Sequence, residues 1–522
     1  MQRFAALLDA LSTAPQRSAK LRLIGDHLAT TPDPDRGLAL AALTGGLDLP
    51  AVKPALVRAL AEARVDPVLF RLSYDYVGDL AETVSLLWPG PVRGEPPSLA
   101  EAVERLRAAT RATAPQVLAG LLDRLDPSGR FALLKLATGA LRVGAGARLA
   151  RVALAERFGL PVAEVEEVWH GLAPPYEALF AWAEGRGPWP EAGPGAGFRP
   201  FMLAHPLEAP AALDLAAHAI EWKWDGIRAQ AVSAPGERRL FSRDGNDISA
   251  AFPDLVAALP DTPLALDGEL LVRSPDGTPA GFHALQQRLN RKAPDARLLR
   301  ELPVFLRAYD LLAEGGADLR PLPWAARRAR LERVIACLPP DRFDLSPLVP
   351  VADHAALAEA RARPPHASIE GVMLKRRDAP YLAGRVTGLW WKWKKDPLTA
   401  DCVLMYAQRG HGRRSSFYSD FTFGAWGPDG TLLPVGKAYF GFTDEELAWL
   451  DRWVREHTVA RFGPVREVEK ALVLEVAFEG VAASARHRSG IALRFPRIAR
   501  IRADKPAAEA DTVERIAALA RP

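Results

Sequence analysis

A stretch rich in glycine and proline divides this 522-residue sequence into two parts with different patterns. The stretch, GRGPWPEAGPGAGFRP, covers residues 185–200 and contains too much Gly and Pro for a regular helix or strand. Ala, Leu, Arg and Glu predominate before it, whereas short β-like runs alternate with helical ones after it. We therefore expect a linker at this point and a chain of two to four domains, as the length also favours.

The part before the linker has the periodicity of packed α-helices. Apolar residues recur at helical spacing in Leu99, Val103 and Leu106, and again within 117–125. Ser98 and Glu101 have the spacing of a capping box, which predicts the start of a helix. We expect an all-α domain over residues 1–185.

The part after the linker predicts a mixed α+β domain followed by a β-rich one. In the first, we expect strands at 218–224, 238–242, 264–272, 303–312 and 369–375, with helices near 282–292 and 324–338. In the second, we expect strands at 401–408, 416–426, 431–440 and 471–480 around one helix at 443–457. Strands around a single helix suggest an OB-type barrel. The predicted domains are 200–397 and 398–522.

Charge and cysteine content exclude several classes of protein. The net charge of +4 is too small to identify a nucleic-acid-binding protein, so the distribution of charge matters more than its sum. Cys337 and Cys402 lie far apart, which excludes a disulfide framework and a four-cysteine zinc site and fits a reducing cytoplasm. The first residues lack a signal-peptide pattern, and the sequence has no run of about twenty apolar residues, so we expect a soluble chain.

One lysine is placed as a covalent nucleophile would be. In EWKWDGIR, Lys223 stands between two tryptophans, at the end of a predicted strand and beside an Asp-Gly turn. A lysine is normally a solvated ammonium without a lone pair, so covalent use needs a desolvated site or neighbouring cations that lower its pKa. The alternative from these residues alone is an exposed lysine before a turn.

Acidic residues at predicted strands could supply a metal site. Asp267 and Glu269 flank Gly268, and the period of two in a strand places both carboxylates on one face. Glu370, before GVMLK, repeats the pattern. Carboxylates near phosphates usually act through Mg²⁺. Taken singly, each acid could instead be a surface salt-bridge partner.

Basic residues form two clusters that are interleaved with aromatic residues. The clusters are Lys375, Arg376, Arg377, Arg385, Lys392, Lys394 and Lys395, and then Arg486, Arg488, Arg494, Arg497, Arg500 and Arg502. Alternation in WWKWKK predicts Lys392 and Lys394 on one face and Trp391 and Trp393 on the other. Such a strand would suit a triphosphate, although charge runs are usually only solvated faces.

These segments together resemble the covalent nucleotidyltransferase superfamily, and within it the ATP-dependent DNA ligases. KWDG resembles the KxDG motif, whose lysine, here Lys223, takes AMP as a phosphoramidate. Glu221 matches the acidic residue that helps to read adenine, and Arg228 matches the arginine after the motif. SRDG at 242–245 resembles the next element, whose arginine, here Arg243, contacts the ribose and the region of the 3′-OH terminus.

Four further positions match the nucleotide site of this family. Glu269 in DGE matches the acid that binds ribose or metal, and Glu370 in EGVMLK matches a second metal-ligating acid. Lys375 closes the same motif and would belong to the ATP site. Tyr309 in AYDLL matches the aromatic residue that stacks on adenine, because a flat π face holds a base at little entropic cost.

The remaining matches lie in the basic clusters. Lys392 and Lys394 match paired lysines that contact the α-phosphate. RFPR at 494–497 resembles the C-terminal element whose arginines, Arg494 and Arg497, would orient the departing pyrophosphate. The sequence departs modestly from the family at positions 222 and 224, where tyrosine is commoner than tryptophan, and at Tyr309, where phenylalanine is frequent.

The resemblance, strong from about 200 to 505, implies a fold and an activity. It implies an all-α DNA-binding domain, an α+β nucleotidyltransferase core of the ATP-grasp-like ligase type and a β-barrel OB-fold domain. Residues 135–156 are similar to the helical DNA-binding domain of larger cellular ligases. The implied activity joins 3′-OH and 5′-phosphate ends through lysyl-AMP and adenylated-DNA intermediates, with ATP as substrate, Mg²⁺ as cofactor and nicked duplex DNA as partner.

The resemblance also implies a cellular role. We expect a monomer of the bacterial cytoplasm, associated with the nucleoid, that serves DNA repair, recombination or replication beside a repair nuclease or helicase.

Two other classes stay open. An RNA ligase or a GTP-using capping enzyme shares the lysine chemistry, and a noncatalytic DNA-binding scaffold could share the fold. The retained lysine, acids and arginines disfavour the scaffold, and the helical N-terminal part with RFPR favours a DNA ligase. No GxxxxGK[ST] motif is present, which disfavours a P-loop ATPase, and the zinc cysteines of NAD-dependent ligases are missing.

Overall fold

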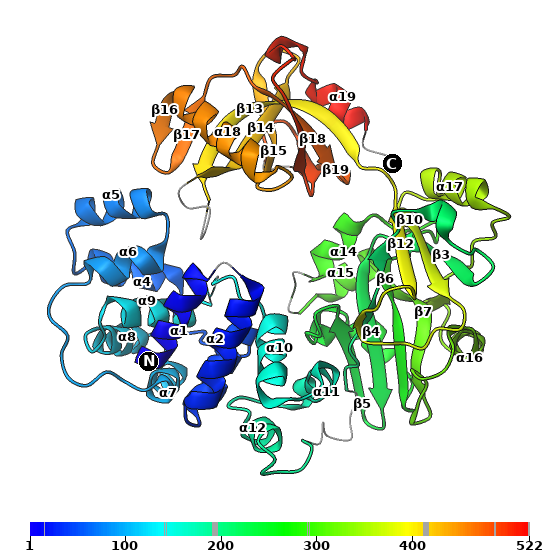
Figure 1. Cartoon of the computed structure of the whole chain (residues 1–522), viewed down its shortest axis with the longest axis horizontal. Helices are drawn as coiled ribbons and strands as arrows, with labels where there is room; N and C mark the ends of the chain where they lie inside the picture. The colour runs from blue at the N-terminus through cyan, green and yellow to red at the C-terminus, as the bar shows by residue number, and fades with distance from the viewer. Residues whose placement is uncertain are drawn as a thin grey trace. The chain divides into compact units, whose positions relative to one another are not determined.

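The computed structural model describes residues 1–14, 16–139, 141, 143–190, 197–289, 291, 293–410, 417–484 and 487–519 (Figure 1). Arg486 of the second basic cluster lies outside the described residues, as do Ala140 and Arg142 of the 135–156 stretch and residues 191–196 of the predicted linker. Within the described ranges, no helix combines the length and the apolar character needed to cross a membrane.

The chain divides into two compact units. The first is formed by Met1–Val162, Leu172–Pro190 and Pro397–Ala520, and the second mainly by Ala163–Gly171 and Glu191–Asp396. The first unit contains a helical region and a β-rich region. The division into three domains at 1–185, 200–397 and 398–522 stays a prediction.

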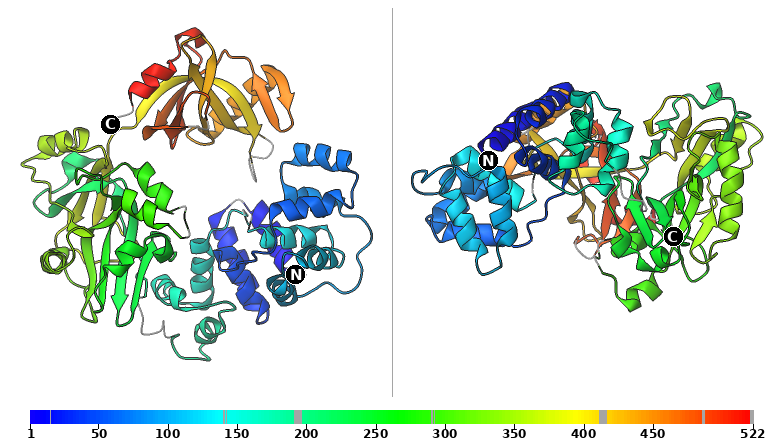
Figure 2. Two further views of the ribbon diagram at one scale, coloured as in Figure 1. Left: turned by 180° about the vertical axis from the view of Figure 1, so that it is seen from behind. Right: turned by 90° about the horizontal axis from the view of Figure 1, so that it is seen from below.

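The helical region runs from residue 2 to residue 183 (blue to cyan in Figures 1 and 2). Its helices are α1 (Gln2–Thr13), α2 (Arg17–Thr30), α3 (Asp35–Thr44), α4 (Pro54–Glu62), α5 (Pro67–Val77), α6 (Leu80–Leu87), α7 (Leu99–Ala108), α8 (Ala114–Leu122), α9 (Pro127–Ala137), α10 (Ala147–Phe158) and α12 (Glu177–Ala183). Between the last two, α11 (Val162–Val168) belongs almost wholly to the second unit. The predicted spacing is confirmed, since α7 buries Leu99, Val103 and Leu106 and α8 buries Leu118, Leu121 and Leu122.

The predicted capping box at α7 is only half formed. The Ser98 hydroxyl accepts a hydrogen bond from the Glu101 backbone N–H at 2.9 Å. The Glu101 carboxylate instead accepts from Arg124 Nη1 at 2.5 Å, because a charged partner competes with the backbone N–H. A complete box is present at the predicted 443–457 helix, α18 (Asp444–Glu456), where Thr443 and Glu446 bond to each other's backbone N–H groups.

Two sheets form the second unit. One has the order β5-β4-β6-β7-β8, with β9 also paired to β7, and the other has the order β2-β12-β10-β3. The first sheet contains β4 (Ile227–Ala234), β5 (Glu237–Ser242), β6 (Leu264–Val272), β7 (Val304–Glu314), β8 (Ala317–Asp318) and β9 (Phe343–Leu345). The second contains β2 (His205–Pro206), β3 (His218–Trp224), β10 (Ile369–Arg376) and β12 (Trp390–Lys394), and β1 (Met202–Leu203) pairs separately with β11 (Gly384–Arg385).

Each sheet packs one face against helices, while the other face of the first sheet carries both polar residues and further buried apolar residues such as Val232, Ala265 and Leu312. On β6, Leu266 and Leu270 enter a core that includes Leu285 of α14 (Phe282–Leu289) and Leu331 of α16 (Trp324–Ala336). On the second sheet, the core includes Leu357 of α17 (His354–Ala362). The smaller helices of this unit are α13 (Pro253–Ala257) and α15 (Ala296–Glu301).

The β-rich region of the first unit is one seven-stranded antiparallel sheet (yellow to red in Figure 1). Its order is β15-β14-β13-β17-β16, with β18 paired to both β13 and β21. The strands are β13 (Leu398–Arg409), β14 (Tyr418–Trp426), β15 (Leu432–Ala438), β16 (Thr458–Phe462), β17 (Val465–Val468), β18 (Val473–Phe478) and β21 (Arg497–Arg502), with a separate β19 (Gly480–Ala483) and β20 (Ile491–Arg494) pair and a last helix, α19 (Val513–Ala518). Helix α18 covers its apolar core through Leu447, Leu450 and Val454.

Candidate active site

Lys223, at the end of β3, lies against a carboxylate from the neighbouring strand. Its Nζ donates to Glu370 Oε1, and Lys394 Nζ lies 2.9 Å from Glu370 Oε2. One carboxylate therefore stands between two ammonium groups. Burial raises the pKa of Glu370, but Lys223 and Lys394 outweigh it and hold that pKa below its usual value.

Two glycines allow the strands around Lys223 to approach closely. A Cβ at Gly226 of the KWDG motif would lie 2.3 Å from the Leu270 carbonyl oxygen and 2.8 Å from the Glu269 side chain. Gly371, which pairs with Lys223 across β3 and β10, has a φ of +149° and would place a Cβ 2.2 Å from the Trp393 carbonyl oxygen. Any other residue at either position would push the strands apart.

The second predicted acid, Glu269, lies on β6 beside the same cluster. Burial raises the pKa of Glu269 to about 8, and the charges of Glu370 and Asp225 also raise it, while Lys223 and Arg228 oppose the shift. These interactions place Glu269 close to Lys223 and Glu370. The structure thus brings the predicted nucleophile together with both predicted metal-ligating acids.

The basic residues of the second unit gather around Lys392. Burial lowers the pKa of Lys392, and the charges of Arg385, Lys223, Arg243 and Lys394 lower it further. Arg243 is exposed and lies in the turn after β5. Positive charge is therefore concentrated around Lys392.

The alternation predicted for WWKWKK is observed. Trp391 and Trp393 pack against Ile220, Val372 and Leu374 in the core of the second sheet. Lys392 and Lys394 lie on the opposite face of the strand. There Lys394 pairs with Glu370, and the charge of Lys223 lowers the pKa of Lys392 in addition to the effect of burial.

A second group of charges lies deeper, around Glu221, the residue predicted to read adenine. Glu221 is 1% exposed, and its carboxylate accepts from Lys375 Nζ at 2.7 Å and from Arg328 Nη1 at 3.3 Å. Lys375 is equally buried, donates to the Tyr309 carbonyl at 3.2 Å and lies 4.4 Å from the centroid of the Tyr309 ring. The predicted adenine-stacking and adenine-reading residues are therefore linked through one lysine.

The predicted ATP-binding Arg228 is bound to a buried acid. Its Nε and Nη2 donate to Asp267 at 3.0 and 2.7 Å, and the Tyr381 hydroxyl donates to the same carboxylate at 2.7 Å. The Arg228 guanidinium also lies 4.4 Å from the ring centroid of Phe201. Asp267, at 0% exposed, therefore anchors Arg228, while Glu269 on the same strand faces Lys223.

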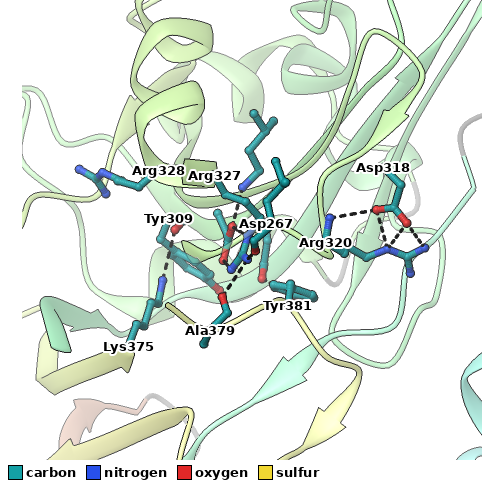
Figure 3. Close-up of polar contacts among 12 residues, drawn as sticks. Asp267, Tyr309, Asp318, Arg320, Arg327, Arg328, Lys375, Ala379 and Tyr381 are labelled. Carbon is teal, nitrogen blue, oxygen red and sulfur yellow. Dashed lines mark hydrogen bonds and ion pairs between the residues drawn. The ribbon is translucent and has the colours of Figure 1, made fainter. Parts of the chain in front are cut away.

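Sequence reasoning missed four residues of this interior. Arg327 of α16 forms a fully buried pair with Asp310 of β7, at 2.7 and 2.9 Å, and also donates to the Ala379 carbonyl (Figure 3). Arg328 and Tyr381 were also missed. For Arg327 and Arg328, the only signal in the sequence was that they are adjacent in a predicted helix that also contains the apolar residues Trp324 and Leu331. Charged residues in a helix usually indicate a solvent-exposed face, so this signal did not point to burial.

Arg494 and Arg497 belong to the first unit, and their predicted role toward ATP stays a prediction. Arg494 ends β20 and Arg497 begins β21. Phe495 between them has a φ of +49°, a conformation that is uncommon for a residue with a side chain, and its ring lies 5.2 Å from the Arg494 guanidinium.

A cavity of about 400 Å³ lies near β12, but not at Lys223. It is lined by residues that include His205, Leu207, Leu213 and Trp391. Trp391 belongs to the apolar face of β12, so this cavity does not provide the adenosine site.

Comparison with known proteins agrees with this geometry. Residues 201–394 match the ATP dependent DNA ligase domain, and residues 414–505 match the ATP dependent DNA ligase C terminal region. A probable DNA ligase of Koribacter versatilis is 32% identical over 99% of this chain and 96% of its own, and one of Anaeromyxobacter dehalogenans (strain 2CP-C) is 35% identical over 98% and 97%. A solved structure named Pmar-Lig_PreS3 shares the fold with a TM-score of 0.59, at 16% identity over 96% of this chain and 99% of its own. The chain therefore belongs to the ATP-dependent DNA ligase family, and is an enzyme that seals nicks in DNA with ATP as a substrate.

Proposed function

We propose that Lys223 is the nucleophile of a three-step ligation. Its Nζ forms a bond to the α-phosphorus of ATP as the bond to pyrophosphate breaks, and the AMP then moves to a 5′-phosphate at a nick. The 3′-OH finally attacks that phosphate and releases AMP. The observation that supports this proposal best is the contact of Lys223 with Glu370, beside Glu269 and under the positive charge around Lys392. Glu370 is in contact with the proton that Lys223 must lose before attack.

The remaining predicted residues would hold the nucleotide. Tyr309 would stack on adenine, Glu221 would accept from its amino group, and Lys375 would keep both in place. Arg228, held by Asp267, and Arg243 would serve the ribose side of the site. Lys392 and Lys394 would neutralise the α-phosphate, and Arg494 and Arg497 would orient the departing pyrophosphate.

Glu269 and Glu370 are the residues that would hold Mg²⁺. Among the described residues, no group of three or more His, Cys, Asp or Glu could bind a metal. Two carboxylates nevertheless fit Mg²⁺, which keeps several waters and usually takes its remaining ligands from substrate phosphates. When bound, the ion would supply charge neutralisation at the phosphates.

The parts of the first unit would serve DNA. We infer that residues 1–185 are a DNA-binding domain and that the sheet of 398–522 is an OB-fold barrel that closes over ATP for the first step and then turns to hold DNA. Contacts would fall mostly on phosphates, so binding would be tolerant of sequence and sensitive to salt. We further propose a cytoplasmic monomer that acts in DNA repair.

The test is incubation of the chain with α-³²P-labelled ATP and a nicked duplex, read for labelled protein and for sealed strand. The wild-type chain should give both, and Lys223→Ala should give neither because no other amine takes its place. Lys53→Ala, at an exposed lysine of the helical region, is the matched control and should keep the label. Label that persists in Lys223→Ala would refute the assignment of the nucleophile.

Crosslinking the 398–522 region should block one step selectively; if all steps proceed, the proposed closure is wrong.

A further inference from the structure

Arg328 is a buried arginine of α16 that lies outside every motif of the family resemblance. Its side chain is 7% exposed. Its Nη1 donates to Glu221 Oε1 at 3.3 Å and to the Ser346 carbonyl at 2.9 Å, and its Nε donates to Glu332 at 2.8 Å. Three hydrogen-bond acceptors therefore hold the guanidinium in place. One of them is the carboxylate of Glu221, which is proposed to recognise the base.

Arg328 and Lys375 hold the two oxygens of Glu221 separately. Arg328 bonds to Oε1, and Lys375 bonds to Oε2. Both partners can only donate hydrogen bonds, so their contacts favour the ionised carboxylate. Burial is the largest influence and raises the pKa of Glu221 above its usual value, with a smaller contribution from Asp310, while Lys375 and Arg328 oppose this shift. Without Arg328, a single cation would oppose the burial.

The ionisation of Glu221 decides which base it can recognise. Adenine presents an amino donor at C6, whereas guanine presents a carbonyl acceptor at the same position. An ionised carboxylate has only acceptor sites, so it pairs with the adenine amino group and repels the guanine oxygen. A protonated carboxyl can donate, and would tolerate guanine.

We propose that Arg328 is a specificity-determining residue, which keeps Glu221 as a hydrogen-bond acceptor and thereby makes the site select adenine over guanine nucleotides. This inference rests on the proposed function, in which Glu221 contacts the adenine amino group. Arg328 acts through Glu221 and does not itself touch the nucleotide in this scheme. Its bond to the Ser346 carbonyl also attaches α16 to the strand region after β9, so a structural role must be separated from a role in selectivity.

The ratio of the rate constants for ATP and GTP distinguishes a role in selectivity from a structural role. Single-turnover rates of adduct formation are measured on the full chain over a range of α-³²P-labelled ATP and GTP concentrations. The quotient of the two second-order constants is compared among variants. Misfolding lowers the active fraction for both nucleotides equally, so the quotient is insensitive to it.

We expect Arg328→Gln to lower the ATP-to-GTP quotient by roughly tenfold or more, the discrimination that one correctly paired base contact provides. Arg328→Lys keeps a cation near Glu221 and should retain most of the selectivity. Arg333→Gln, at an exposed arginine of the same helix, is the matched control and should leave the quotient unchanged. An unchanged quotient in Arg328→Gln would show that Arg328 is only structural and would overturn the inference.

A double variant tests whether the effect passes through Glu221. Glu221→Gln should lower the quotient by itself, because an amide can donate as well as accept. Adding Arg328→Gln to it should cause little further loss. If Arg328→Gln lowers the quotient by the same factor in both backgrounds, Arg328 does not act through Glu221 and the inference is wrong. Absence of any adduct in the wild-type chain would instead overturn the proposed function together with the inference.

Discussion

Two groups of charged residues in the second unit differ in burial and in how well their charges are matched. The open cluster comprises Lys223, Glu269, Glu370, Lys392 and Lys394, and the buried network comprises Glu221, Asp310, Arg327, Arg328 and Lys375. In the open cluster, the side chains of Lys223, Glu370 and Lys394 are 22%, 21% and 40% exposed. In the buried network, no side chain is more than 7% exposed, and each acid is paired.

This difference in burial and charge matching indicates that the open cluster is suited to bind a substrate and that the buried network stabilises the fold. The open cluster has more positive than negative charge, since Glu269, with a pKa of about 8, is largely protonated at neutral pH. A triphosphate would supply the missing negative charge. In the buried network every cation has an acidic partner, since Arg328 pairs with Glu332 as well as with Glu221, and this fits the high cost of an unmatched charge away from water. Variants in the network should therefore affect folding or selectivity, and variants in the cluster should affect the reaction.

The largest expected effect is on stability, from breaking the most buried pair. Arg327→Met leaves Asp310 without its arginine at a site that is 1% exposed, and we expect a loss of roughly 3–5 kcal/mol in the free energy of unfolding. Denaturant titration measures it, with Arg333→Met on the same helix as the control. A loss within about 0.5 kcal/mol, as surface substitutions give, would break the distinction between the two groups.

Next in size is the loss of the carboxylate that Lys223 and Lys394 share. Glu370→Ala should slow adduct formation by roughly 10²–10³-fold, the scale of removing one preorganised electrostatic contact. Glu370→Gln keeps the shape and should be nearly as slow, because the charge is what matters. Single-turnover labelling measures both, and Glu359→Ala at an exposed position is the control. Near-normal labelling by the glutamine variant would exclude a role for the charge.

Replacing one lysine of the open cluster should lower the activity without lowering the stability. Lys392→Ala should slow adduct formation by roughly 10–100-fold, as expected for the loss of a charged hydrogen bond to phosphate. Because burial and, to a smaller extent, neighbouring cations lower the pKa of Lys392, its charge is unfavourable in the folded chain without substrate. The melting temperature of the variant should therefore stay the same or rise. A clear fall would show that Lys392 belongs with the scaffold.

The smallest expected effect is a change in the stability of the chain with pH, which tests the protonation of Glu269 in the open cluster. The pKa of Glu269 is raised to about 8 in the folded chain, so between its ordinary value and 8 the folded state holds a proton that the unfolded state has lost. This contribution to stability is complete at low pH and is lost as the pH rises toward 8. Glu269→Gln does not titrate, so its melting temperature relative to wild type should increase between pH 5 and pH 9 by roughly 2–4 °C. A constant difference would contradict the shifted pKa.

Several elements of the second unit, namely β3, β5, β6, β7, β10, α14 and α16, could be predicted because their patterns are local, whereas β4 and α17 were not predicted. The LALDGELLV segment forms β6, and its alternation correctly separates Leu266 and Leu270, which enter the core, from Asp267 and Glu269. WWKWKK behaves in the same way. A strand has a strict period of two, so a short segment contains enough information to assign its faces.

The buried network could not be predicted in this way. Glu221 and Arg328 are 107 positions apart, and neither a propensity nor a period relates them. The capping box at Ser98 shows the same limit on a smaller scale, since Glu101 has the right spacing but pairs with Arg124, which the sequence brings near only through packing.

From the sequence alone came the helical first part, several strands and helices of the later parts, the lysine motif, the two acids and the family that these residues resemble, because each depends on neighbouring positions. Tertiary structure alone decided which charges stay open for a substrate and which are matched in the interior. It assigned Glu370 to Lys223 and Lys394, Asp267 to Arg228, and Arg328 to Glu221. The physical reason is that ion pairing and burial depend on distances across the fold, and these distances exist only after the strands and helices have packed.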